Sequence, residues 1–145
     1  MAIRRSIGLL DRLTYNAGYG RIFEHGRIYL YDGQQPTSPD HGVSISPLAV
    51  VCQGGITPIP GSSVGGLEFN FPGGGVLSDY PQWVAKGMRT GRVTWWRMFW
   101  YLPDPNTDSQ EYPRMDGGIN DSLFMLDRDI VAGTNYNVES FTMRV

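Results

Sequence analysis

Glycine and proline interrupt this sequence so often that a helical bundle is excluded. The 19 glycines and 10 prolines make up a fifth of the 145 residues. Glycine loses conformational entropy inside a helix, and proline removes a helical hydrogen bond. The apolar fraction of 41% is still high enough for a hydrophobic core. We therefore expect a single mainly β domain over residues 1–145, built from short strands and long loops.

The segment Gly91–Leu102 (GRVTWWRMFWYL) predicts the central strand of that domain. Both of its faces are largely apolar, as expected for a strand buried between two layers. Phe141, Met143 and Val145 alternate with polar residues, which predicts a C-terminal strand with one buried face. This C-terminal strand spans Tyr136–Val145. Six further strands are expected at Arg27–Tyr31, Leu48–Cys52, Leu67–Phe71, Arg114–Gly118, Ser122–Leu126 and Asp129–Gly133. This spacing predicts an antiparallel β-sandwich of the jelly-roll or immunoglobulin-like kind, with a short N-terminal helical segment.

Residues 1–26 are expected to form a helical N-terminal arm, followed by the β-sandwich over residues 27–145. Ile7, Leu10 and Leu13 recur every three residues and would share one face of a helix over Ser6–Tyr15, with Ser6 as its N-cap. A second short helix is expected over Tyr19–His25. The arm could pack on its own domain or dock on a neighbouring subunit, and both alternatives stay open. The three apolar residues are candidate interface residues.

Two aromatic residues at the end of the central strand are further interface candidates. Trp100 is the tryptophan expected to be most exposed, and Tyr101 follows it. Exposed aromatic rings serve either as stacking platforms for sugars or as anchors in protein interfaces. Burial in the core is the simpler interpretation of the other tryptophans in this strand.

Acidic side chains gather in one predicted turn. Asp116, Asn120 and Asp121 carry oxygen atoms that could bind calcium. Their spacing differs from the EF-hand loop, and the same residue types commonly form Asx turns. In polar turns these acids should keep ordinary pKa values, which does not suit a general acid. We therefore predict no metal site and no catalytic carboxylate pair here.

The remaining residues of catalytic type predict no enzyme and no cofactor. His25, near a helix end, and His41, in a loop, are expected at the surface, and Cys52 is expected to be an unreactive core thiol. The net charge of −2 includes no basic excess that would predict nucleic-acid binding. No apolar run approaches the ~20 residues needed to span a bilayer, so no membrane partner is expected.

Several short motifs, taken in order, resemble a family of small virion-associated proteins of tailed bacteriophages, encoded among head and tail genes. The resemblance covers about three quarters of the chain. It rests on Tyr31-Asp32-Gly33, Gln35-Pro36, Pro39-Asp40, Leu48-Ala49, Gly91 with Trp95 and Arg97, Met115-Asp116-Gly117, Ile130 with Ala132-Gly133, and Ser140-Phe141-Thr142.

The resemblance implies a structural component of the virion, present in multiple copies at the head, neck (collar) or tail. Its partners would be copies of itself and other virion proteins, and it would assemble in the cytoplasm of the host bacterium. The alternative function is a carbohydrate- or receptor-binding module of the particle. The resemblance implies no catalytic or binding residue. Because long loops are costly to order in an isolated subunit, residues 54–75 and 103–113 are expected to be ordered chiefly by contacts between chains.

Overall fold

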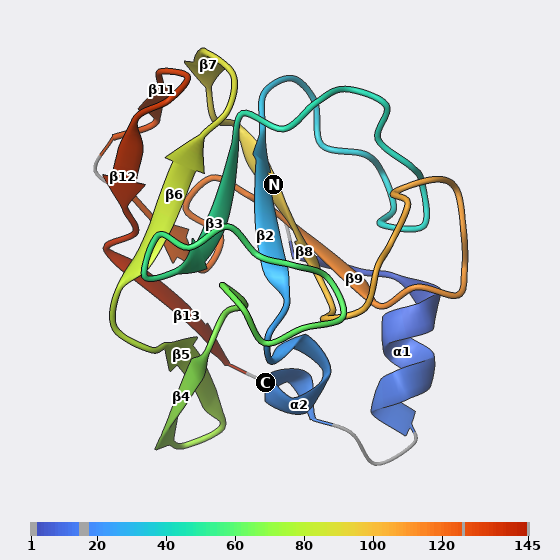
Figure 1. Cartoon of the computed structure of the whole chain (residues 1–145). Coiled ribbons are helices and arrows are strands. Elements are labelled where there is room, and N and C mark those ends of the chain that lie inside the picture. Colours follow the sequence, from blue (N-terminus) through green and yellow to red (C-terminus); the bar gives the residue numbers. More distant parts are fainter. Residues whose placement is uncertain (1–2, 15–17, 126, 145) are drawn as a thin grey trace.

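The computed structural model describes residues 3–14, 18–125 and 127–144 and is mainly β (Figure 1). Its largest sheet is antiparallel, and its seven strands lie in the order β1 (Arg4–Arg5), β9 (Arg114–Gly118), β8 (Trp95–Phe99), β2 (Arg27–Tyr31), β3 (Ala49–Gln53), β6 (Trp83–Gly87) and β12 (Asn135–Asn137). A second sheet has the order β10 (Leu123–Phe124), β13 (Ser140–Arg144), β5 (Val76–Asp79) and β4 (Phe69–Gly73). A small pair joins β11 (Asp129–Ile130) to β7 (Gly91–Arg92).

The second sheet packs against one face of the first, which confirms the antiparallel sandwich. Phe141 on β13 places its ring centroid 5.3 Å from that of Trp83 on β6 and 5.9 Å from that of Trp96 on β8. Ile28 and Leu30 of β2 lie on the same core face and are fully buried. The sandwich core therefore forms where alternate apolar residues of the two sheets meet.

The opposite face of the large sheet is covered by loops rather than by a third layer. Tyr31 stacks on Trp95 there, with ring centroids 4.5 Å apart, and three arginines on this face, Arg27, Arg97 and Arg114, are buried. In Figure 1 the segments 32–47, 54–66 and 103–113 lie on this side of the sheet. Both faces of β8 are buried, as the apolar run in the sequence predicted.

In this structure the N-terminal segment packs on its own chain, which is the first of the two alternatives left open by the sequence. Strand β1 pairs with β9, so that Arg4 lies opposite Asp116. Helix α1 (Ile7–Thr14) follows, and the Ser6 hydroxyl oxygen accepts a hydrogen bond from the Leu9 N–H at 3.0 Å, which confirms the N-cap. The buried side chain of α1 is Leu9, whereas Ile7 and Leu10 are exposed.

Several strand boundaries differ from those predicted. The run Gly91–Leu102 divides into β7 and β8, because Gly91 and Arg92 pair with β11 whereas Trp95–Phe99 pair with β2 and β9. The segment Leu67–Phe71 becomes strand only from Phe69, and Phe71 is exposed rather than buried. Phe141 and Met143 are buried as predicted, while Val145 lies outside the described residues.

Residues 103–113 make hydrogen bonds to other segments of their own chain, and their ordering by contacts between chains stays a prediction. The Asp108 carboxylate accepts from the Gly42 N–H at 2.7 Å, and the Asn106 carbonyl oxygen accepts from the Val43 N–H at 3.0 Å. Segment 54–75 also makes internal hydrogen bonds, among them Gln53 N–H to Gly65 carbonyl oxygen at 3.1 Å. No helix within the described ranges is long and apolar enough to cross a bilayer.

Candidate functional site

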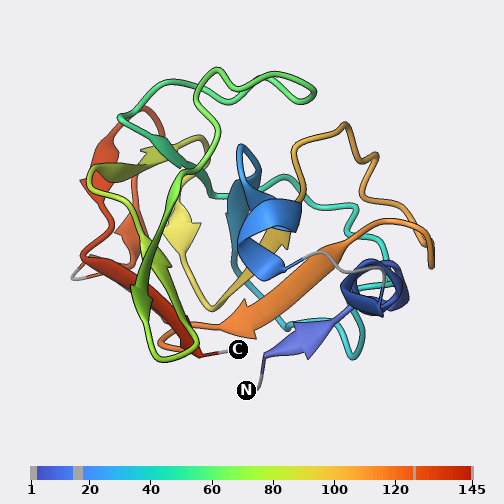
Figure 2. The same cartoon turned by 90° about the horizontal axis from the view of Figure 1, so that it is seen from below.

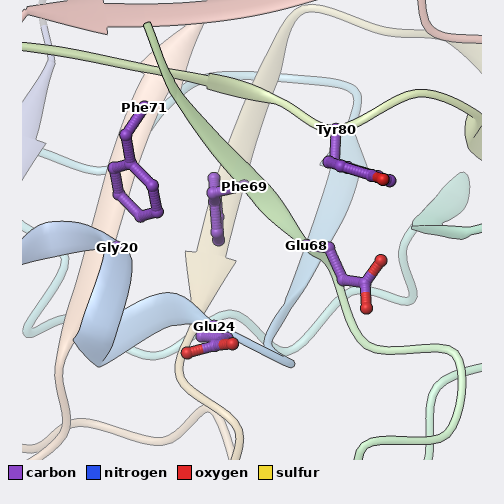
Figure 3. A pocket seen from close by; sticks show the side chains of 6 residues that line it. All are labelled: Gly20, Glu24, Glu68, Phe69, Phe71 and Tyr80. Carbon is purple, nitrogen blue, oxygen red and sulfur yellow. The ribbon is translucent and has the colours of Figure 1, made fainter. Parts of the chain in front are cut away.

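Three adjoining hollows surround the short helix α2 (Tyr19–Phe23), which lies at the centre of the view in Figure 2. The first, shown in Figure 3, has a volume of about 320 Å³ and is lined by Gly20, Glu24, Glu68, Phe69, Phe71 and Tyr80. The second, of about 460 Å³, shares Gly20 and Phe71 with it. The third, of about 270 Å³, is lined by Arg12, Arg21, Ile22, Trp100, Tyr101 and Leu102. We call the residues of the three hollows the α2 surface.

Phe71 separates the first two hollows, and glycine at position 20 makes this arrangement possible. A Cβ atom on Gly20 would lie 2.5 Å from the Cε1 and Cζ atoms of the Phe71 ring. The ring therefore rests directly on the backbone of α2, yet 66% of Phe71 remains exposed. Tyr80, on the far side of Phe69 in Figure 3, is 49% exposed. An exposed pair of large rings beside a hollow is typical of binding surfaces.

The first hollow also carries two carboxylates, Glu24 from the end of α2 and Glu68 from the residue before β4. Both are exposed, and Glu24 lies 3.7 Å from the Nε2 atom of His25. Carboxylates beside aromatic rings offer hydrogen-bond acceptors and a negative potential to a polar or cationic group. Sequence reasoning missed both residues, because each is an isolated acid with no motif around it.

The third hollow contains the predicted aromatic pair. Trp100 is half-buried and is the most exposed of the four tryptophans, as predicted, and Tyr101 is 42% exposed. The two rings meet edge to face with centroids 6.2 Å apart. The Arg12 guanidinium lies 4.9 Å from the centroid of Trp100 and covers one face of its ring. Tyr101 is thus the more accessible of the two stacking surfaces.

The candidate interface residues of helix α1 divide between surface and core. Ile7 is 40% and Leu10 47% exposed, while Leu13 is half-buried and packs against the core. Ile7 and Leu10 therefore lie on an exposed edge of α1, and Gly8 and Leu9 form its buried face. Gly8 is needed there because a Cβ atom would lie 2.5 Å from the Glu111 carbonyl oxygen.

The acids predicted to share a turn do not converge. Asp116 lies in β9, is fully buried, and binds Arg97 through both carboxylate oxygens, at 2.7 and 2.9 Å. Asp121 instead accepts from the Gly118 N–H at 2.8 Å, and the Asn120 side-chain oxygen accepts from Arg128 at 2.7 Å. Within the described residues no group of three or more His, Cys, Asp or Glu side chains is placed to hold a metal ion.

The prediction of an ordinary pKa for Asp116 is wrong. Burial raises the pKa of this carboxyl, while the hydrogen bonds and the charge of Arg97 act against that rise. The sequence placed Asp116 next to a turn, but β9 is an inner strand, and loop residues cover the face to which this side chain belongs. Asp116 is therefore a buried structural partner of Arg97.

The two histidines and the cysteine lie close to where the sequence placed them. His41 is exposed, and His25, at φ 63° just after α2, is half-buried. Cys52 is fully buried in β3, which confirms the expectation of a core cysteine, and this burial raises the pKa of its thiol.

Comparisons of this chain with protein families, with curated proteins and with solved structures give no match. Its function must therefore be argued from its own residues and from the resemblance of its motifs.

Proposed function

We propose that this protein is a structural component of a tailed bacteriophage virion, present in multiple copies at the head, neck or tail. The observation that carries the proposal is the exposure of large apolar side chains around the hollows of the α2 surface. Phe71, Tyr80 and Tyr101 are each more than two-fifths exposed. The order of the sequence motifs, which resembles small virion-associated proteins, supports the same function.

The chemistry of the α2 surface suits contacts between proteins. Aromatic residues and arginine are enriched at interfaces, and they contribute a large share of the binding energy. Arg21 lines both the second and the third hollow and is exposed, and its guanidinium makes no hydrogen bond or ion pair with the residues that the structure describes. An unpaired arginine between exposed aromatic rings is available to a neighbouring chain.

Virion membership is tested by mass spectrometry of purified particles from the phage that encodes this chain. We expect the protein in intact particles, in a constant ratio to the major capsid protein. A phage carrying Phe71→Ser and Tyr101→Ser should yield fewer complete particles, because Ser removes the apolar contact area. Thr142→Ala, at an exposed position on β13, is the matched control. Absence of the protein from purified particles would refute the proposal.

Glycan or receptor binding remains the second candidate, and Tyr101 favours it specifically. This ring is exposed beside a hollow of about 270 Å³, as a sugar-stacking platform would be. A glycan array probed with the purified protein tests this function, with Tyr101→Ala as the variant that should lose any signal. Binding that Tyr101→Ala leaves unchanged would exclude this hollow as the glycan site.

A further inference from the structure

Three buried arginines lie on the loop-covered face of the large sheet, and one of them differs from the other two. Arg97 binds Asp116 with two hydrogen bonds, and Arg114 binds Asp104 at 2.7 and 2.6 Å. Arg27, the first residue of β2, is only 4% exposed but pairs with no carboxylate among the described residues. A buried charge without a counter-ion is costly, so Arg27 is the unbalanced member of the set.

The contacts of Arg27 leave part of its hydrogen-bonding capacity unused. Its Nη1 donates to the Trp100 carbonyl oxygen at 3.2 Å, and its guanidinium lies 4.8 Å from the ring centroid of Phe99 and 5.5 Å from that of Tyr29. The Nε–H is buried and has no acceptor among the described residues. Aromatic rings stabilise a guanidinium without neutralising it, so both its charge and one of its donors are left without a partner.

A cavity of about 210 Å³ lies against Arg27, and a second cation lines it. Lys86 on β6 reaches the cavity from two strands away, and its Nζ donates to the Thr57 hydroxyl at 3.2 Å. The other lining residues are Tyr29, Val50, Pro58, Gly87 and Met88, so the lining contains no acid. Segment 54–66 passes over this part of the sheet in Figure 1, and Thr57 and Met88 at the cavity are exposed.

We propose that this cavity binds a small oxyanion, a phosphate or a carboxylate group, between Arg27 and Lys86. The volume suits one such group, and the guanidinium and ammonium supply the donors that an oxyanion requires. The bound anion takes the place that Asp116 and Asp104 occupy beside the other two buried arginines. Neither the assembly role nor the α2 surface enters this inference.

The test is a titration of the purified full-length protein with sodium phosphate and, separately, with sodium acetate, at constant ionic strength and pH 7. Thermal unfolding is followed by tryptophan fluorescence. At about ten times the dissociation constant, binding should raise Tm by roughly 3–6 °C in a saturable manner. The probe that gives the tighter saturable response identifies the group as phosphate or carboxylate. No saturable response to either anion would overturn the proposal.

Variants separate this site from general effects of phosphate, which stabilises many proteins without binding. Arg27→Met should abolish the saturable shift, and Lys86→Met should weaken binding about tenfold, as loss of one charge-assisted contact predicts. Arg21→Met, which removes an exposed arginine at the α2 surface, should respond like the wild type. An unchanged response of Arg27→Met would refute the assignment.

A tethered carboxylate gives a test that does not depend on the folding of Arg27→Met. Thr57 is exposed and lines the cavity, so Thr57→Glu places a carboxylate beside both cations. We expect Thr57→Glu to melt above the wild type in chloride and to lose the response to added anions. Thr57→Gln, which has the same shape and no charge, should do neither. A Thr57→Glu variant that still responds like the wild type would contradict the proposed site.

Discussion

The ion pair between Arg97 and Asp116 should be the most sensitive single contact in this protein. Arg97→Met removes the partner of a fully buried carboxylate. It also removes the donor to the His41 carbonyl oxygen at 2.7 Å and to the Asn106 side-chain oxygen at 2.8 Å. Three acceptor groups on three segments of the chain therefore lose their partner in one substitution.

The expected loss of unfolding free energy is ~3–5 kcal/mol, the usual cost of removing one member of a buried pair. Domains of this size have a total stability of only about 5–15 kcal/mol, so the variant should be close to unfolding. Protonation of Asp116 limits this loss of unfolding free energy, because burying a neutral carboxyl is less unfavourable than burying a charged one. Without Arg97 the folded-state pKa of Asp116 rises further, so Arg97→Met should regain stability as the pH falls from 7 to 5.

Urea unfolding followed by tryptophan fluorescence measures this effect, since Trp96 precedes Arg97 and the Trp95 ring centroid lies 5.6 Å from its guanidinium. The double variant Arg97→Met with Asp116→Leu leaves no unpaired charge and should be more stable than Arg97→Met alone. Arg92→Met is the matched control, because the Arg92–Asp129 pair is mostly exposed and should contribute less than ~1 kcal/mol.

Two results would refute this reasoning. One is a loss of less than ~1 kcal/mol of unfolding free energy for Arg97→Met at pH 7, because removing one member of a buried pair should cost more than that. The other is additivity of the two single substitutions in the double variant, which would mean that the two side chains are not energetically coupled.

Three further outcomes are expected. Gly117→Ala should lower the free energy of unfolding, measured in urea, by ~1–3 kcal/mol, because its Cβ would lie 2.4 Å from the buried ring of Trp96. An unchanged free energy of unfolding would show that the ring can move. The Cys52 thiol, buried and with a raised pKa, should react with a thiol reagent only on the timescale of unfolding, and fast labelling of the folded protein would contradict this. Arg89 lowers the pKa of Asp32 from 3.8, so the pair stabilises the fold above that pH, and this contribution is lost as the pH falls through the lower folded pKa. Because both side chains are about one-third exposed, Arg89→Met should reduce stability at pH 7 by at most ~1 kcal/mol, and this loss should shrink as the pH falls below 3.8.

Local sequence patterns were sufficient for the features that depend on neighbouring residues. Three such features appear in the structure near their predicted positions. They are the strand at Arg27–Tyr31, the strand around Trp95 with two apolar faces, and the N-cap Ser6. The period-two alternation also predicted the buried side chains of β13. These features follow from propensity and periodicity, which act over a few residues.

Strand β6 shows where local patterns were insufficient. Residues Trp83–Gly87 pair with β3 and β12 near one edge of the large sheet, yet their sequence, WVAKG, ends in lysine and glycine and predicts no strand by itself. Pairing with two neighbours supplies the hydrogen bonds that stabilise the segment as a strand. That stabilisation is invisible from the segment alone.

The sequence by itself determined the mainly β architecture, the two-sided burial of β8 and the buried position of Cys52. Only the tertiary structure decided that Asp116 is a buried ion-pair partner, that Arg27 has no carboxylate beside it, and that Phe71 lies exposed on α2. The physical reason is distance along the chain: Arg97 and Asp116 are 19 residues apart, and Phe71 meets Gly20 across the fold. Such contacts depend on how strands pair and which face a loop covers, and no local propensity specifies them.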